Sequence, residues 1–520
     1  MTRGDRAVRE RLMRPVPRDG LWGWVGPLMV AAVAGVLRFW RLGTPKAFIF
    51  DETYYAKDAY SLLKFGVEQG FISSGNKKAP DPANAKILAG NLKGIFTGDP
   101  SYVVHPPGGK WVIAIGERMF GMTPFGWRFM VALLGTLSVL MIARIGRRLF
   151  RSTLLGCTAG LLLAVDGLAY VHSRTALLDP ILMFWVLAAF GALLIDRDRT
   201  RALLAERLEG LTRLRDFGPS SGWRPWRLIA GVCLGAACAT KWSGIWFVGM
   251  FGLMTVLWDV GARRTAGVRR PWAGALVRDA APAFASLVLV AFAVYLASWT
   301  GWFLGGQHAY GRYWARDHPG WPFVPDALVS LWHYHQQAWS FHTHLESFHP
   351  YRSNPWGWLV LARPVSYYYQ SARLGEHGCE VQSCSQAITS LGTPAIWWAA
   401  CLALPVLGYL WAARRDWRAG AILAGVAAGY LPWFFFQQRT IFSFYAVAFV
   451  PFLVLAVTMC LGLVIGPADA SPRRRQWGVA AAGAYVLLAV ANFAWLLPVL
   501  SAQVIPYADW AHRMWWRSWI

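Results

Sequence analysis

Two adjacent carboxylates, Asp51 and Glu52, stand beside the first long apolar stretch of the sequence, inside the aromatic run 48–55. A carboxylate at the edge of an apolar region is costly unless it is used or paired, and partial desolvation raises its proton affinity. Such a group suits general-base chemistry near neutral pH. The residues that follow also predict a helix, for which Asp51 would be an ordinary N-cap. The two carboxylates alone do not separate a base from a cap.

Four cations at the ends of later apolar stretches could bind an anionic substrate: Arg128, Arg174, Lys241 and Arg439. Lys241 lies between two short apolar stretches and needs an anionic partner, which a lipid phosphate would supply. The planar guanidinium of Arg439 can hold a phosphate. Ordinary alternatives exist, because Lys241 could be an interfacial lysine without a ligand, Arg128 could snorkel to lipid head groups, and Arg174 could pair with Asp179.

The segment His105-Pro106-Pro107-Gly108-Gly109-Lys110 forms another polar cluster. Its prolines stop a helix, and its glycines allow a backbone to approach a ligand closely. A loop turn that leads into an interfacial helix at 109–120 is the simpler alternative.

Five histidines crowd one later segment, at positions 333, 335, 342, 344 and 349. Their spacing does not match a zinc motif, so hydrogen bonding to a substrate is favoured over metal binding, with structural packing as the alternative. The one-residue gap between His342 and His344 predicts a strand or loop rather than one helix face. Farther along, an oxidising exterior would favour a disulfide between Cys379 and Cys384, with a free pair of thiols as the alternative.

The elements that must position these residues are predicted to be transmembrane helices. The 520 residues are 56% hydrophobic and only 15% charged, with 31 tryptophans, which excludes ordinary soluble and disordered proteins. Apolar stretches occur at 22–42, 127–148, 153–170, 176–195, 226–240, 242–258, 276–298, 391–413, 418–436, 440–465 and 477–499. The predicted fold class is an all-α polytopic membrane protein with about eleven transmembrane helices.

The net charge of +24 is interpreted as a topology signal, not as a nucleic-acid surface. With the N-terminus in the cytoplasm, more than half of the basic residues fall in the inner segments, all as arginine facing anionic head groups. These segments are 1–20, 144–151, 196–227, 259–278, 414–418 and 469–475, of which 196–227 alone could hold an amphipathic helix. The C-terminus is then outside, as are two large loops at 43–126 and 299–390.

The chain accordingly divides into five parts: a basic cytoplasmic tail (1–21), a transmembrane catalytic module (22–298), the second outer loop (299–390), C-terminal transmembrane helices (391–499) and an outer tail (500–520). We expect the polar clusters at the outer helix ends to converge in one extracytoplasmic pocket. Because no nucleotide pool exists on that side, a group donor there must be dissolved in the bilayer. This favours glycosyl transfer from a polyprenyl-phosphate sugar.

The ordered motifs resemble the bacterial protein O-mannosyltransferases of actinobacterial type, which are GT-C membrane glycosyltransferases. The motifs are Phe50–Tyr55, His105–Lys110, Arg128-Phe129, Ser173-Arg174 with Asp179, Lys241-Trp242, Pro350–Ser353 and Gln438-Arg439. Eukaryotic relatives insert a large β-trefoil MIR domain in the second outer loop. The loop 299–390 is too short for one, so acceptor handling must differ here.

The resemblance implies inverting transfer of mannose from polyprenyl-phosphate-mannose to Ser or Thr of translocated polypeptides, at the outer face of the plasma membrane. Asp51 would be the general base, and Glu52 would orient the base or the acceptor. Donor phosphate contacts are assigned to Lys241, Arg174, Arg439 and Arg128, and other substrate contacts to Tyr54, His105, Asp179, His342, His344, Arg352 and Gln438. No metal or cofactor is assigned, although a divalent metal is left open. The expected partners are the donor lipid, acceptor polypeptides, membrane lipid and the translocon, without nucleic acid.

Two other functions fit these residues less well. One is a transferase that moves a sugar or aminosugar from a polyprenyl phosphate to a lipid or glycan. The other is a transporter of lipid-linked sugar, which predicts paired hydropathy halves and ionisable residues near mid-membrane. The sequence has neither feature.

Overall fold

A computed structural model of the chain describes residues 9–13, 19–75, 79–209 and 216–520, which form a mostly helical protein. Within these ranges, eight helices are long and apolar enough to cross a membrane. They are α2 (Leu21–Phe39), α6 (Pro124–Phe150), α9 (Leu178–Leu208), α11 (Gly244–Thr265), the helix Pro271–Ser298 that includes α12 (Pro271–Ala275), α13 (Ala281–Phe284) and α14 (Val290–Ser298), α17 (Pro394–Ala412), the helical segment Ser443–Ile465 that includes α19 (Val450–Ile465), and α20 (Pro472–Leu500). The chain is therefore a polytopic membrane protein.

Shorter helices account for the other predicted stretches. α10 (Pro225–Thr240) matches 226–240, and α18 (Trp417–Tyr430) matches most of 418–436. The stretch 153–170 is interrupted, because α7 (Thr153–Ala164) ends before Asp166, whose carboxylate caps α8 (Gly167–His172). Each predicted stretch thus falls on helix, and length and composition mark eight of the helices as spans in the described chain.

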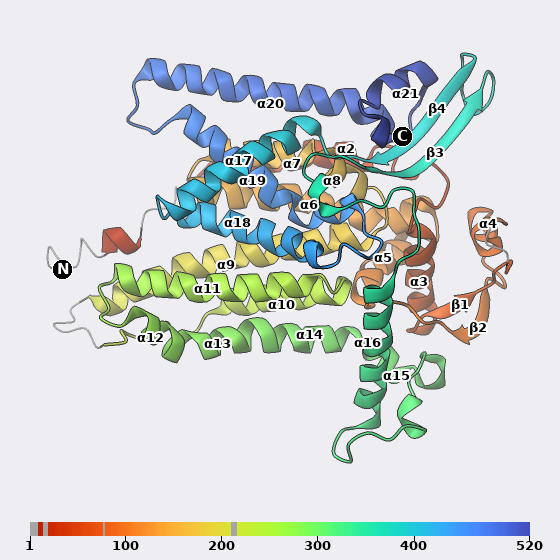
Figure 1. Ribbon diagram of the computed structural model, residues 1–520, viewed down its shortest axis with the longest axis horizontal. Coiled ribbons are helices and arrows are strands. Elements are labelled where there is room, and N and C mark those ends of the chain that lie inside the picture. The colour runs from red at the N-terminus through yellow and green to blue at the C-terminus, as the bar shows by residue number, and fades with distance from the viewer. Residues whose placement is uncertain (1–8, 14–18, 76–78, 210–215) are drawn as a thin grey trace.

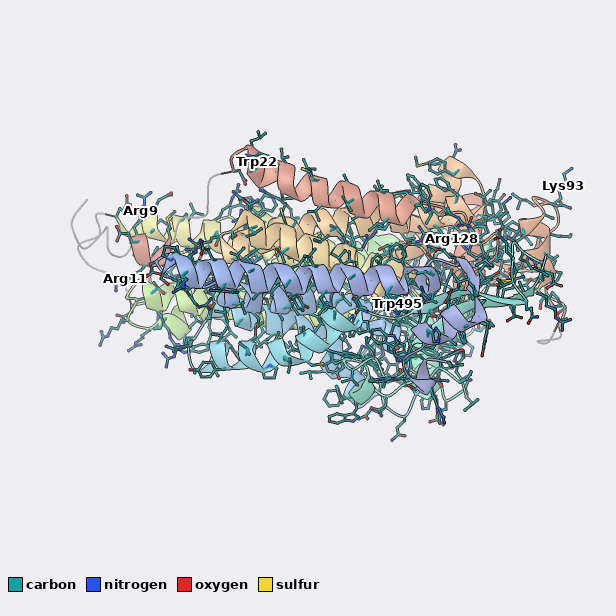
Figure 2. All side chains as sticks on the ribbon, turned by 90° about the horizontal axis from the view of Figure 1, so that it is seen from above. Arg9, Arg11, Trp22, Lys93, Arg128 and Trp495 are labelled. Carbon is teal, nitrogen blue, oxygen red and sulfur yellow. A yellow bond between two sulfur atoms is a disulfide. The ribbon has the colours of Figure 1, made fainter. Side chains whose placement is uncertain are left out.

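Figure 1 shows the long helices side by side, with the smaller elements gathered at one end of the bundle. In Figure 2, Trp22 at the start of α2 lies at the same end as Arg9 and Arg11, whereas Lys93 and Arg128 lie at the opposite end. The C-terminal end lies beside α21 (Tyr507–Arg513), at the end that carries the strands. Of the predicted basic tail, residues 1–8 and 14–18 lie outside the described residues, as do 210–215 of the predicted inner segment 196–227.

The small elements come from the two predicted outer loops. The first loop forms α3 (Glu52–Phe65), β1 (Gln69–Phe71), α4 (Pro82–Leu88), β2 (Phe96–Pro100) and α5 (Gly108–Phe120), with β1 and β2 antiparallel. The second forms α15 (Thr300–Leu304), α16 (Asp326–His344) and the hairpin of β3 (Val365–Arg373) and β4 (Ser383–Ser390), which β5 (Val504–Pro506) extends. The predicted disulfide between Cys379 and Cys384 is confirmed at the turn of this hairpin.

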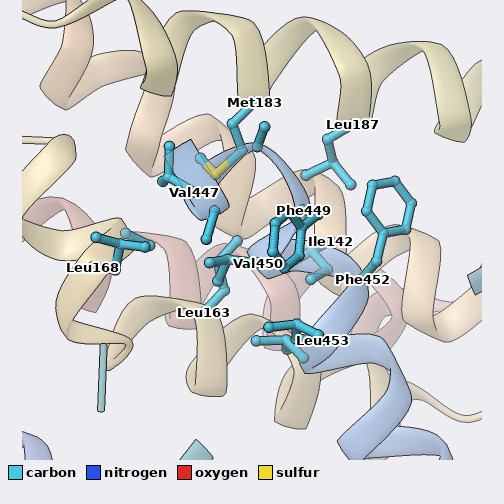
Figure 3. Close-up of a cluster of buried hydrophobic side chains, with 14 of the residues drawn as sticks. Ile142, Leu163, Leu168, Met183, Leu187, Val447, Phe449, Val450, Phe452 and Leu453 are labelled. Carbon is cyan, nitrogen blue, oxygen red and sulfur yellow. The ribbon is translucent and has the colours of Figure 1, made fainter. Parts of the chain in front are cut away.

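Apolar side chains from five helical segments pack into a core at the centre of the bundle (Figure 3). They include Ile142, Leu163, Leu168, Met183, Leu187, Val447, Phe449, Val450, Phe452 and Leu453. Small residues let the helices approach closely, since a Cβ on Gly156 of α7 would lie 2.5 Å from the Ala143 carbonyl oxygen of α6. Such close packing holds helices together where lipid tails are as apolar as the side chains.

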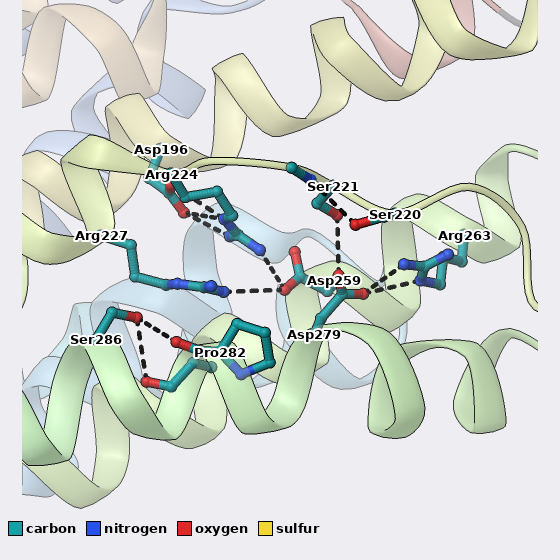
Figure 4. A network of polar contacts seen from close by, with 12 residues as sticks. Asp196, Ser220, Ser221, Arg224, Arg227, Asp259, Arg263, Asp279, Pro282 and Ser286 are labelled. Carbon is teal, nitrogen blue, oxygen red and sulfur yellow. Dashed lines mark hydrogen bonds and ion pairs between the residues drawn. The ribbon is translucent and has the colours of Figure 1, made fainter.

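Buried ion pairs join helices at the end of the bundle opposite the strands (Figure 4). Arg224 contacts Asp196 at 2.5 Å and Asp259 at 2.6 Å, and Arg263 contacts Asp279 at 2.7 Å. All five side chains are buried. The prediction that the arginines of these segments face lipid head groups is wrong for Arg224 and Arg263. They neutralise buried aspartates, because a charge away from water needs a partner.

Candidate active site

Asp51 lies at the N-cap position of α3, but its side chain does not cap the helix. The carboxylate makes no capping hydrogen bond, and among the described residues it has no ion-pair partner. Burial raises the pKa of the Asp51 carboxyl to about 7, while nearby Lys241 opposes this rise and nearby Asp179 adds to it. The carboxylate is therefore available to accept a proton from a ligand.

Glu52 is fully buried and supports the structure around Asp51. Its carboxylate accepts hydrogen bonds from Nε and Nη2 of Arg128 at 2.8 and 2.7 Å, and from the backbone N–H groups of Ile49 and Ala176. Arg128 is buried as well and also donates to three carbonyl oxygens of the segment 42–47.

This arrangement corrects two predicted roles. Arg128 does not bind donor phosphate, because Glu52 and the backbone use its guanidinium on every side. Glu52 does not face an acceptor, because its side chain is fully buried in the ion pair with Arg128. Of the two roles predicted for Glu52, orienting the base is the one that the arrangement allows, since the pair anchors the segment that carries Asp51.

Arg174 caps α2 instead of binding a phosphate. Its guanidinium donates to the carbonyl oxygens of residues 37, 38, 40 and 41, at distances of 2.7 to 3.3 Å. A cation at a helix C-terminus satisfies free carbonyl groups and complements the helix dipole. The predicted ion pair of Arg174 with Asp179 is also wrong, because Asp179 pairs with Lys241.

Lys241 lies between an acid and an aromatic ring. Its Nζ is 2.8 Å from Oδ1 of Asp179 and 4.2 Å from the ring centre of Tyr445. An ammonium group has three donors, so Lys241 keeps donors for a ligand after the bond to Asp179 is made. Lys241 and Asp179 both lie near enough to Asp51 for their charges to shift the pKa of its carboxyl. Three side chains that are far apart in the sequence are therefore close together in the fold.

A cavity of about 470 Å³ opens beside Lys241. Its walls are mostly apolar and rich in aromatic rings, and its titratable side chains include His105, His335, His342 and Arg439. Nε of Arg439 is buried without a hydrogen-bond partner, and within the described ranges its guanidinium has no ion-pair partner. Because an unpaired buried donor is costly, the cavity suits an anionic group placed between Arg439 and Lys241.

The glycine pair of the His105–Lys110 motif brings His105 to this cavity. A Cβ on Gly108 would lie 2.8 Å from the carbonyl oxygen of Ala239, so α5 begins in direct contact with the chain just before Lys241. The glycine thus permits close approach to another backbone, not to a ligand as the sequence suggested. Burial, reinforced by the charge of Lys241, holds the pKa of His105 well below its usual value, so the imidazole is neutral.

α16 forms another wall of the cavity. His335, Trp339 and His342 recur at helical spacing and all line the cavity. The predicted strand or loop at His342 and His344 is wrong, because both lie on α16. His344 is exposed and bonds back to the helix.

Five predicted substrate contacts lie outside the cavity lining: Asp179, which is buried and pairs with Lys241, and the exposed Tyr54, His344, Arg352 and Gln438. Several aromatic residues of the site were not predicted, among them Tyr295, Trp339 and Trp433. Aromatic residues inside or beside apolar stretches usually only pack, so no sequence signal separates these three. In the described part of the chain, no group of three or more His, Cys, Asp and Glu side chains is placed to hold a metal ion.

Two protein-family models match the chain. The model described as dolichyl-phosphate-mannose-protein mannosyltransferase covers residues 95–300, and the model of the C-terminal four-helix transmembrane region of protein-O-mannosyltransferase covers residues 327–519. A polyprenol-phosphate-mannose–protein mannosyltransferase of Mycolicibacterium smegmatis is 42% identical, over 97% of this chain and 94% of its own length. The protein of the same name from Corynebacterium glutamicum is 34% identical, over 99% and 98%. The chain belongs to the protein mannosyltransferase family. It is a glycosyltransferase.

Solved structures agree on the fold of this mannosyltransferase. The S. cerevisiae protein O-mannosyltransferase Pmt1-Pmt2 complex, bound to the sugar donor, superposes with a TM-score of 0.71 at 15% identity, covering 100% of this chain and 94% of the matched chain. ArnT from Cupriavidus metallidurans, bound to undecaprenyl phosphate, superposes at 0.50 with 17% identity, covering 95% and 76%. The fold is therefore of the GT-C type.

Proposed function

We propose that this mannosyltransferase transfers mannose from polyprenyl-phosphate-mannose to Ser or Thr hydroxyls of polypeptides, at the outer face of the plasma membrane. The observation that carries the proposal is the Asp51 carboxylate, which has no ion-pair partner among the described residues and lies near Lys241, while Lys241 and Arg439 line the cavity. The names of the relatives supply the donor and the protein acceptor.

The proposed reaction is a single displacement with inversion at the anomeric carbon. The acceptor hydroxyl oxygen forms a bond to that carbon, its proton passes to Asp51, and the bond from the carbon to the phosphate oxygen breaks. Polyprenyl phosphate leaves with the electron pair. A base whose pKa is near the working pH is suited to this proton transfer, which typically contributes about 10²- to 10⁴-fold.

Lys241 and Arg439 would stabilise the phosphate as it departs. Lys241 is pre-oriented by Asp179 and Tyr445, whereas Arg439 is unpaired until a ligand arrives. Charges that are fixed before the reaction stabilise developing negative charge without the cost of reorganisation. His105 and His342 lie 5.0 Å apart, ring centre to ring centre, and offer neutral hydrogen-bonding groups to the sugar.

The lipid tail of the donor would leave the cavity along exposed apolar side chains. Ile245 and Trp246 of α11 and Phe292 of α14 line the cavity and are exposed on the surface of the helix bundle. The outer location is supported by charge, because the arginine-rich segments are predicted inside and both predicted outer loops contribute residues to the cavity lining, among them His105 and His342.

Transfer to a lipid or glycan acceptor is the second candidate. An undecaprenyl phosphate-α-4-amino-4-deoxy-L-arabinose arabinosyl transferase of Pseudomonas aeruginosa is 36% identical to this chain, but over only 26% of it. That similarity favours a common polyprenyl-phosphate donor and does not extend to the acceptor. Mass spectrometry of secreted proteins from a deletion strain separates the two candidates, since unchanged hexosylation would favour a non-protein acceptor.

The decisive experiment compares two neighbouring amide substitutions in membranes supplied with polyprenyl-phosphate-mannose and a Ser/Thr-rich peptide. Asp51→Asn should fold normally and lose at least about 10²-fold in kcat, because it removes an unpaired base. Glu52→Gln should instead destabilise the protein by about 3 kcal/mol, because it leaves the buried Arg128 without its counter-charge. Full turnover by well-folded Asp51→Asn would exclude Asp51 as the base.

A further inference from the structure

A chain of hydrogen bonds runs along the cavity wall from the residue next to Lys241. Nε1 of Trp242 donates to the hydroxyl oxygen of Tyr295 at 3.0 Å, and that oxygen lies 2.6 Å from Nε2 of His335. Nδ1 of His335 lies 2.6 Å from the Leu331 carbonyl oxygen, which can only accept, so Nδ1 carries the hydrogen. Nε2 of a neutral His335 then accepts the hydrogen of the Tyr295 hydroxyl.

The direction of these bonds is fixed from end to end. Burial lowers the pKa of His335, so its neutral form is favoured. The rings of Trp242 and His335 also stack, with centres 5.5 Å apart and planes 20° apart. Because the indole N–H, the phenol O–H and both imidazole nitrogens are used, removing one group leaves a partner unpaired.

The helix at the end of this chain of bonds is held at other points as well. The hydroxyl of Tyr334 bonds both the N–H and the carbonyl oxygen of Val103, and Nε2 of His342 lies 2.9 Å from the carbonyl oxygen of Val104. α16 therefore ties the segment that leads to His105 to the turn that follows Lys241. In Figure 1, α16 lies across the ends of the bundle helices, next to α14 and α5.

We propose that Trp242, Tyr295 and His335 are positioning residues, whose bonds hold α16 against the Lys241 turn and fix Lys241 for the donor phosphate. The identity of that anion rests on the function proposed above. A cation that is already in place binds without the cost of ordering it, so the three residues should act on donor binding rather than on acceptor binding.

The first test removes one hydroxyl group with Tyr295→Phe. The matched control is Tyr485→Phe on α20, whose hydroxyl likewise donates one hydrogen bond, to the carbonyl oxygen of Ala395 at 3.0 Å, and which does not line the cavity. The KM for polyprenyl-phosphate-mannose should rise about tenfold in Tyr295→Phe, because the Tyr295 hydroxyl takes part in two hydrogen bonds, one from Trp242 and one to His335, and it should not change in the control. The KM for the acceptor peptide should not change in either variant. A general loss of folded protein would lower the rate with both substrates and would not raise the donor KM alone.

The second test asks whether the residues act as one unit. His335→Gln keeps an acceptor for the Tyr295 hydroxyl and should retain part of the donor affinity, whereas His335→Phe should lose as much as Tyr295→Phe. The double variant Tyr295→Phe/His335→Phe should lose less than the sum of the two single losses, because the Tyr295–His335 bond that both variants remove is lost once. Additive losses in the double variant would contradict a connected set of bonds.

Binding of polyprenyl phosphate alone, followed as thermal stabilisation, separates this inference from the proposed function. If the wild type binds the lipid more tightly than Tyr295→Phe but transfers no mannose, the positioning role stands and the proposed function fails. If the wild type transfers mannose and Tyr295→Phe has the same donor KM and lipid affinity, the positioning role is overturned. An equal effect of Tyr485→Phe would overturn it as well.

Discussion

At the scale of the residue, hydrogen-bond partners decide what each carboxylate can do. Asp51 and Glu52 are neighbours of similar chemistry, but Glu52 accepts four hydrogen bonds and Asp51 caps nothing. The cations divide in the same way, since Glu52 and backbone carbonyls occupy Arg128 and the end of α2 occupies Arg174, whereas Arg439 keeps a buried Nε without a partner among the described residues. Free hydrogen-bonding capacity, rather than charge, identifies the reactive groups.

The state of Asp51 leads to a pH prediction. Burial raises its pKa to about 7, and a general base must be ionised to accept the hydroxyl proton. We therefore expect kcat to rise with pH up to about 7 and to level off above it, with the protonated form inactive on the acid side. An ordinary carboxyl would already be ionised at about pH 5.

A pH–rate profile at saturating donor and acceptor checks this prediction, and thermal unfolding at each pH controls for loss of fold. A profile that stays flat from about pH 5 to about pH 8 would mean that Asp51 is not the group that limits the reaction.

At the scale of the element, the contact between Gly108 at the start of α5 and Ala239 sets the distance between His105 and the turn that carries Lys241. Gly108→Ala should disturb this contact, because its Cβ would lie 2.8 Å from the Ala239 carbonyl oxygen, next to the turn that carries Lys241. We expect a loss of about 1 to 3 kcal/mol in stability, together with weaker donor binding. Gly249→Ala in α11 is the control, because no atom lies within 4 Å of its added Cβ, and it should be neutral. Unfolding temperature and donor KM measure both effects, and a silent Gly108→Ala would contradict this role of the glycine.

The elements themselves were largely predictable from the sequence, whereas their polar partners were not. Long apolar stretches identify helices because a span needs about 20 apolar residues, and each predicted range falls largely on helix, with a break before Asp166 in 153–170. The His342/His344 spacing pointed away from helix, but His335, Trp339 and His342 share one face of α16. The partner of Asp179 is Lys241, 62 residues away, rather than its near neighbour Arg174. Nothing local in a sequence distinguishes such partners, because the pairing depends on which helix ends meet.

At the scale of the whole molecule, buried charged side chains lie at both ends of the bundle, but in different surroundings. One end holds the paired Arg224 and Arg263, and the other holds Asp51, Lys241 and the cavity. A lipid-borne donor requires this arrangement, since its head group must lie at one membrane surface while its tail stays in the bilayer. The function proposed above therefore depends on which end faces outward.

Cysteine labelling in intact cells tests that orientation. Lys93 is exposed at the end that carries the small elements, and Arg473 is exposed at the start of α20, at the opposite end. We expect Lys93→Cys to react with a membrane-impermeant maleimide in intact cells, and Arg473→Cys to react only after permeabilisation, because positively charged segments stay in the cytoplasm. The unsubstituted protein is the background control, as Cys379 and Cys384 are joined and the remaining cysteines lie in helices. The reverse labelling pattern would place Asp51 on the cytoplasmic side, where translocated polypeptides could not reach it, and would exclude the proposed reaction.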